Sequence, residues 1–103
     1  MNTAKKEYLN LYLLQEAKIT RLEKMAIQNP AQKEKFNTQI KKALTLRDEI
    51  EEKIRNVDNA VLSELLFQKY ICGKTLEEIG YILNYSKRHI ERLHIEALKK
   101  FEI

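Results

Sequence analysis

Glycine and proline, the residues that most often interrupt regular structure, are nearly absent from this chain. Two glycines and one proline occur in 103 residues. This scarcity removes the turn signals that separate the strands of β-hairpins and β-sandwiches. Apolar residues recur instead at spacings of three and four, which is the period of an amphipathic helix. We therefore expect an all-α fold.

The composition narrows the class of protein further. Charged residues make up 33% of the chain and apolar residues 44%, which suits packed helices with solvated outer faces and does not suit a disordered chain. The formal net charge of +4 permits a nucleic-acid partner but does not identify one. Cys72 is the single cysteine, so we expect neither an internal disulfide nor a cysteine-based zinc site.

The N-terminus begins directly with charged, helix-forming sequence. No apolar run approaches the length of a membrane span, and no signal peptide is recognisable. We therefore expect a cytoplasmic protein without a membrane partner.

Two long amphipathic patterns fill the N-terminal half. The first runs from Thr3 to about Gln28, and the second from about Pro30 to Val57, with Pro30 in a first helical turn, where its missing N–H costs nothing. The short connection predicts an antiparallel, coiled-coil-like helical hairpin over residues 1–57. The apolar stripes comprise Tyr8, Leu11, Tyr12, Ile19, Leu22 and Ala26 in the first helix, and Phe36, Ile40, Ala43, Ile50, Ile54 and Val57 in the second. Gln15 and Arg47 interrupt them.

The first helix also carries Leu9 and Leu13 on its other side, which indicates more than one packing partner. Two interpretations are open. The hairpin packs only on the rest of the chain, or it forms a homodimer through residues 3–57. We favour the homodimer, because two helices alone would leave much apolar surface exposed.

A helix boundary is expected around residues 56–59, where Asn and Asp side chains compete for backbone hydrogen bonds. We place the domain junction here and assign residues 58–103 to a second domain. Its first helix runs from about Asn59 to Ile71, and Gly73 follows as a C-terminal cap.

The last third contains two capped helices. Thr75 and Glu78 form a capping box, which starts a helix at Leu76. Its inner side carries Gly80, which we expect at a close helix crossing, and the apolar residues Ile79, Ile82 and Leu83. Asn84 suits a left-handed turn, and Ser86 caps a final helix from Lys87 to about Phe101. This pattern predicts a C-terminal three-helix domain that contains a helix-turn-helix.

The outer face of the final helix carries charged side chains of the kinds that contact bases in DNA. Arg and Lys can donate to guanine and Glu can accept from cytosine in the major groove. We expect Lys87, Arg88, Glu91 and Arg92 to read base edges. We expect the DNA backbone to be contacted by Lys74, Thr75, Ser86, His89 and Lys99.

Three segments of this region resemble region 4 of the sigma-70 factors: residues 75–80, 85–88 and 97–101. The resemblance covers about Leu65 to Phe101. The region is also similar to small phage and prophage transcriptional regulators that have a helical N-terminal segment. It implies base-reading positions at Lys87, Arg88, Glu91 and Arg92, a backbone-contacting cap at Thr75, and RNA polymerase as a further candidate partner.

The chain departs from the sigma pattern in three ways. Asn84 replaces the usual turn glycine, and Arg88 stands where an acidic residue is common, so the −35 promoter sequence is not the expected target. The other sigma regions are absent, so a complete sigma factor is not expected.

Other reactive side chains suggest structural roles. We expect Cys72 to pack at the end of its apolar helix and His94 to pack or hydrogen-bond where helices meet. His89 and His94 lie on different faces of one helix, which does not make a metal site. No catalytic dyad, cofactor motif or phosphate loop is recognisable, so we expect neither an enzyme nor a bound cofactor.

These observations predict a sequence-specific transcriptional regulator, derived from a phage or prophage, that binds double-stranded DNA as a homodimer. Two alternatives are open. One is a small terminase-like DNA-packaging protein, although such proteins usually place the DNA reader first. The other is a module that does not bind DNA and docks on RNA polymerase or a repressor.

Overall fold

The computed structural model describes residues 2–103, and within them the regular elements are five α-helices and two short helical turns, with no strand. The predicted all-α class is confirmed. None of these helices combines the length and the apolar composition that a membrane span needs.

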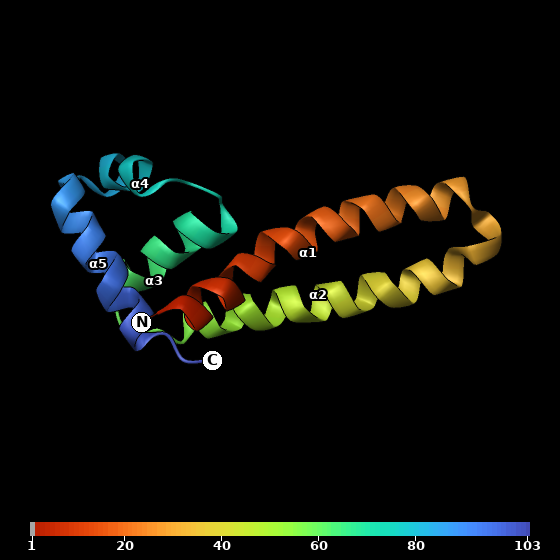
Figure 1. The fold of residues 1–103 in the computed structure, drawn as a ribbon, viewed down its shortest axis with the longest axis horizontal. Coiled ribbons are helices and arrows are strands. Elements are labelled where there is room, and N and C mark those ends of the chain that lie inside the picture. The colour runs from red at the N-terminus through yellow and green to blue at the C-terminus, as the bar shows by residue number, and fades with distance from the viewer. Residues whose placement is uncertain (1) are drawn as a thin grey trace.

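The two longest helices form an arm (Figure 1). Helix α1 covers Thr3–Gln28 and α2 covers Lys33–Arg55, and the two run antiparallel, packed side by side. A 3₁₀ turn at Pro30–Gln32 joins them. Helix α2 therefore begins three residues later than predicted, because the chain first makes this tighter turn, in which Lys33 N–H donates to the Pro30 carbonyl.

The arm buries its own apolar seam. Leu22, Phe36 and Ala43 lie in the outer half of the arm, yet they are only 3%, 6% and 5% exposed within a single chain. We predicted a homodimer because we expected the apolar stripes to be too wide for a single hairpin to bury. Since one chain covers these residues, the seam does not require a second copy.

Two polar residues interrupt the seam without leaving it open. Gln15 is buried between the helices. The Arg47 guanidinium donates to Glu16 Oε1 at 2.8 Å, and this hydrogen bond raises the pKa of Arg47. The polar interruptions seen in the sequence are therefore accommodated between α1 and α2.

The remaining helices gather at one end of the arm (Figure 1). They are α3 (Ala60–Leu66), α4 (Leu76–Leu83) and α5 (Lys87–Lys100). Helix α5 packs against α3 and α4. The molecule measures 52 × 25 × 22 Å, with α5 at one end of the long axis and the α1–α2 turn at the other.

The segment after α3 differs from the continuous helix that we predicted. A π-helical segment, Phe67–Ile71, follows α3, and the Phe67 carbonyl accepts from Cys72 N–H at 3.0 Å. Gly73 then takes a positive φ of 73°, as a C-terminal cap requires. Cys72 is exposed, so our prediction that it packs was wrong. The wider turn ends the helix here and leaves the thiol in solvent.

One continuous core joins the base of the arm to the C-terminal helices. Leu9, on the second apolar side of α1, is fully buried in it. At its edge Lys5 Nζ donates to the Leu98 carbonyl at 2.8 Å, and the Tyr8 and Phe101 rings lie 6.0 Å apart. These contacts fix the end of α5 to the start of α1. The core also includes Ile50, Ile54, Leu62, Leu65, Leu66, Tyr70, Ile79, Ile90, Ala97 and Leu98.

Candidate nucleic-acid interface

Helix α4 begins with the predicted capping box. Thr75 Oγ1 accepts from Glu78 N–H at 3.1 Å, and Glu78 Oε1 accepts from Thr75 N–H at 3.0 Å. The hydrogen bond from Thr75 N–H holds the pKa of Glu78 below its usual value. Since the Thr75 N–H is already bonded, only its hydroxyl hydrogen is left to donate to a phosphate.

The turn between α4 and α5 is a Schellman motif. Asn84 adopts the left-handed conformation, with φ 60° and ψ 46°, as predicted. Tyr85 N–H donates to the Gly80 carbonyl at 2.8 Å, and Asn84 N–H donates to the Tyr81 carbonyl at 3.3 Å. These two bonds satisfy carbonyls that the end of α4 would otherwise leave free.

Gly80 allows this turn to fold back tightly. A Cβ atom at Gly80 would lie 3.0 Å from the Tyr85 carbonyl oxygen and 3.7 Å from Ile90 Cγ2. We expected a crossing helix to be the nearest neighbour of Gly80. The nearest neighbour is instead the backbone of the turn, and the crossing helix α5 is slightly farther away.

The side chain of Ser86 caps α5, since its Oγ accepts from His89 N–H at 3.2 Å. The inner face of α5, including Ile90, Ala97 and Leu98, is buried. The four predicted base-reading residues lie on its exposed side, along a stretch of α5 that is roughly 8 Å long. They are Lys87, Arg88, Glu91 and Arg92.

The predicted backbone-contacting residues are not equally accessible. Ser86 and Thr75 are exposed beside the turn and at the start of α4. Lys74 is half-buried. His89 is also half-buried, because its ring packs on Tyr85 with centroids 4.6 Å apart. The tyrosine therefore restricts the directions from which a phosphate could reach the imidazole.

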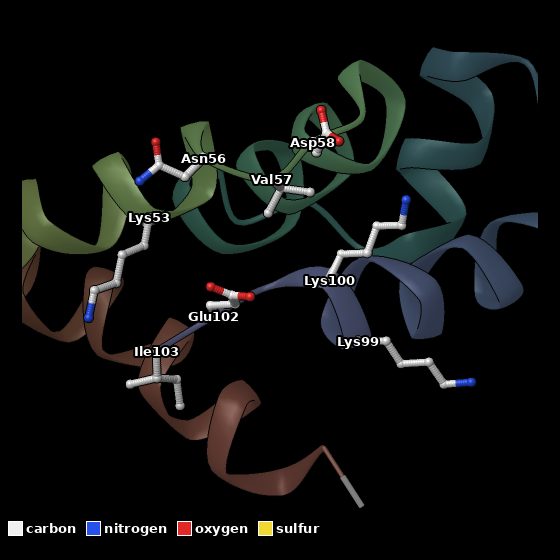
Figure 2. Close-up of a pocket in the computed structure, with 8 residues that line it drawn as sticks. All are labelled: Lys53, Asn56, Val57, Asp58, Lys99, Lys100, Glu102 and Ile103. Carbon is white, nitrogen blue, oxygen red and sulfur yellow. The ribbon is translucent and has the colours of Figure 1, made fainter.

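Lys99 lies far from the other predicted contacts. It is twelve residues beyond Lys87, roughly 18 Å along α5. It borders a hollow of about 590 Å³ between the end of α2 and the end of the chain, which Lys100 and Glu102 also line. Figure 2 shows the Lys99 side chain pointing away from Glu102. Helical spacing places Lys99 on the same stripe of α5 as Arg88 and Arg92.

Tyr81 is a candidate contact that the sequence analysis missed. It is 81% exposed and lines a hollow of about 390 Å³ with Ser86 and Lys87, between α4 and the start of α5. Ile82, which we expected on the inner face of α4, is 52% exposed instead. Helix α4 is short, and Ile79 and Gly80 occupy its buried side.

His94 is buried where α5 meets the π-helical segment, as predicted. Its Nε2 lies 2.8 Å from the Tyr70 hydroxyl. Burial, with Lys69 and Lys6 nearby, lowers the pKa of His94 to about 4, and burial raises the pKa of Tyr70 to about 12. Both groups are therefore neutral at pH 7, and their hydrogen bond supports the core.

The positive charge near this interface is confined to a few side chains at the start of α5. Residues 58–103 contain seven basic and seven acidic side chains, so this part of the chain carries no net charge. Lys87, Arg88 and Arg92 make the start of α5 positive, with Glu91 among them. Attraction of a polyanion to this end of the molecule would depend on these few side chains.

No family model matches the chain, and neither a curated protein nor a solved structure matches it. Within residues 2–103, no group of three or more His, Cys, Asp or Glu side chains is arranged to hold a metal ion.

Proposed function

We propose that this chain is a transcriptional regulator that binds double-stranded DNA sequence-specifically. It would consist of an N-terminal helical hairpin followed by a three-helix domain that contains a helix-turn-helix. Helix α4, the Asn84 turn and α5 would form the reader. The observation that supports this proposal is the exposed group Lys87, Arg88, Glu91 and Arg92 on the first turns of a helix whose start is fixed by two caps. A DNA-reading helix presents its N-terminal residues to the major groove in this way.

The chemistry of these side chains suits base readout. Arg88 and Arg92 can each donate two parallel hydrogen bonds to a guanine, and Glu91 can accept from a cytosine. The hydroxyls of Ser86 and Thr75 and the ammonium groups of Lys74 and Lys99 are suited to phosphates, which position a protein without selecting a sequence. The resemblance to region 4 of the sigma-70 factors and to phage regulators supports the same assignment.

The proposal retains a homodimer, with its contact moved to α1. Leu13 and Leu14 are adjacent, 43% and 50% exposed, and lie outside the seam that the arm buries. We place the contact with a second chain at these two leucines because they are adjacent and exposed. A dimer would link two half-sites on one operator, which strengthens binding without new base contacts.

A second candidate function is a module that docks on RNA polymerase or a repressor. The specific observation in its favour is the absence of net charge over residues 58–103, together with exposed apolar side chains at Tyr81, Ile82 and Ile95. DNA-binding interfaces are much more positive than protein–protein interfaces.

Selection from a pool of random duplexes separates the two candidates. The regulator should enrich one motif over successive rounds, because its base contacts favour some sequences. A docking module should enrich none. Recovery of an unselected pool by wild-type protein would contradict the regulator.

A further inference from the structure

The positive charge of this chain is concentrated far from α5. We define the arm tip as residues 17–46, the outer parts of α1 and α2 with the turn between them. The arm tip contains seven basic residues and two acidic ones, an excess of five positive charges, whereas the whole chain has an excess of four. The rest of the molecule is therefore close to neutral. The basic residues are Lys18, Arg21, Lys24, Lys33, Lys35, Lys41 and Lys42.

The basic side chains of the arm tip are not neutralised within the chain. In residues 2–103, the ion pairs shorter than 4.0 Å belong to Arg47, Lys53 and Arg55, near the base of the arm. None of them includes a basic residue of the arm tip. The tip therefore presents its excess charge to solvent.

Three of these lysines border hollows on the arm. Lys18 and Lys42 line one hollow of about 300 Å³ between α1 and α2. Lys41 and Lys42 line a second, of about 420 Å³, on the surface of α2, which Glu49 also lines. Lys35 precedes Lys42 by seven residues, two turns along the same face of α2. Neutral hydrogen-bonding side chains stand beside them, among them Gln39 in the first hollow and Thr38 in the second.

We propose that the arm tip is a second nucleic-acid site, which binds the phosphate backbone of duplex DNA without sequence preference. Lysine, glutamine and threonine are among the side chains that contact phosphates in protein–DNA complexes. Neutralisation of phosphates by lysine supplies the affinity of non-specific binding.

An anionic membrane surface and an acidic protein fit the arm tip less well than DNA does. A membrane-surface helix needs a broad apolar face beside its lysines, and Ile27 is the one large apolar side chain of the tip that is highly exposed among the residues described. A protein interface is enriched in aromatic residues and depleted in lysine, and the single aromatic residue of the arm tip, Phe36, is buried. Charge without an exposed apolar centre favours a phosphate backbone.

The position of the arm tip implies that it takes a different DNA segment from α5. Helix α5 and the arm tip lie at opposite ends of the 52 Å long axis of the molecule (Figure 1). The molecule would then bridge two duplex segments. This bridging rests on the proposed function of α5, whereas binding by the arm tip does not.

The test compares two full-length variants that each lose two charges. K35Q/K42Q removes charge from the arm tip, and K6Q/K100Q is the matched control outside it; all four side chains are exposed. On random-sequence duplex, K35Q/K42Q should bind roughly tenfold more weakly and flatten the dependence of log K on log salt by about two. The control should lose less than half of that slope. Equal behaviour of the two variants, with folding verified by circular dichroism, would overturn the arm-tip site.

Further measurements identify the ligand and separate this inference from the proposed function. Wild-type protein should bind random duplex DNA more tightly than duplex RNA or vesicles containing phosphatidylserine, and the reverse order would overturn the choice of DNA. In a two-duplex capture assay, wild-type protein on an immobilised selected duplex should retain a labelled second duplex, and K35Q/K42Q should not. If α5 selects no sequence and K35Q/K42Q still weakens random-duplex binding, the proposed function fails and the arm-tip site stands. Retention of the second duplex by K35Q/K42Q would overturn bridging through the arm tip.

Discussion

The backbone of Tyr85 lies directly against Gly80 across the α4–α5 turn. Tyr85 N–H donates to the Gly80 carbonyl at 2.8 Å, and the Tyr85 carbonyl oxygen lies 3.0 Å from where a Gly80 Cβ would be. A glycine in mid-helix costs about 1 kcal/mol relative to alanine. Here it allows the close return of the chain that sets the direction of α5 relative to α4.

Replacing Gly80 with leucine should therefore destabilise the protein. The larger side chain would push the turn backbone and Ile90 away, and overpacking of this kind lowers the free energy of unfolding by about 1–3 kcal/mol. Urea unfolding measures the change. Glu96→Leu on the exposed face of α5 is the control and should stay within about 0.5 kcal/mol of wild type. A Gly80→Leu protein as stable as wild type would show that the turn does not need the close contact.

The buried His94 predicts a loss of stability in acid. Its pKa is about 4 in the folded chain against 6.5 for the free side chain, so folding favours the neutral imidazole. This contribution is fully present above pH 6.5 and is lost as the pH falls toward 4. The pKa difference corresponds to a fall in the free energy of unfolding on the order of 3 kcal/mol by pH 4.

Denaturant titrations at several pH values between 7.5 and 4 check this prediction. His94→Gln removes the titrating group and should be less stable at pH 7, with a flatter dependence on pH. His89→Gln, which keeps His94 and Tyr70 in place, should follow wild type. Parallel curves for wild type and His94→Gln would exclude His94 as the source of acid sensitivity.

If the homodimer forms through Leu13 and Leu14 of α1, a charge at this place should separate the two chains. Leu14→Glu places a charge beside exposed Leu13 and leaves the buried seam intact, so it should give a folded monomer. Light scattering at tens of micromolar should show twice the chain mass for wild type and a single chain mass for the variant. Ile27→Glu, at an exposed site on the arm tip, serves as the control and should remain dimeric. A monomeric wild-type chain would remove the dimer from the proposal.

Local signals in the sequence were sufficient for much of the α4–α5 region. The Thr75 capping box, the left-handed Asn84 and the Ser86 cap each depend on residues within a few positions, and all three are confirmed. The hydrophobic period also gave the bounds of α1 correctly.

Features that depend on distant parts of the chain were not predictable in the same way. The exposure of Cys72 follows from a π-helical segment that no local residue type indicates. The exposure of Ile82 follows from how little of α4 the core covers. The concentration of charge in the arm tip depends on which helix halves lie together, which is a property of the fold.

The proposed phosphate contact of Lys99 predicts a different pattern of binding losses from the proposed base contacts. Because a phosphate contact carries no sequence information, Lys99→Ala should weaken binding to a selected site and to random duplex by similar factors. It should also reduce the salt dependence by about one ion. Competition binding at several salt concentrations measures both effects. A loss confined to the selected site would place Lys99 at a base instead.

Affinity measurements on Arg88→Ala and Arg92→Ala decide whether α5 reads DNA sequence. Each variant should lose about 1–3 kcal/mol of binding free energy on the selected duplex and much less on a random one, because a bidentate contact to a base is lost. Both side chains lie on the exposed face of α5, so circular dichroism should show the wild-type fold. If both folded variants bind the selected duplex as tightly as wild type, α5 does not read DNA.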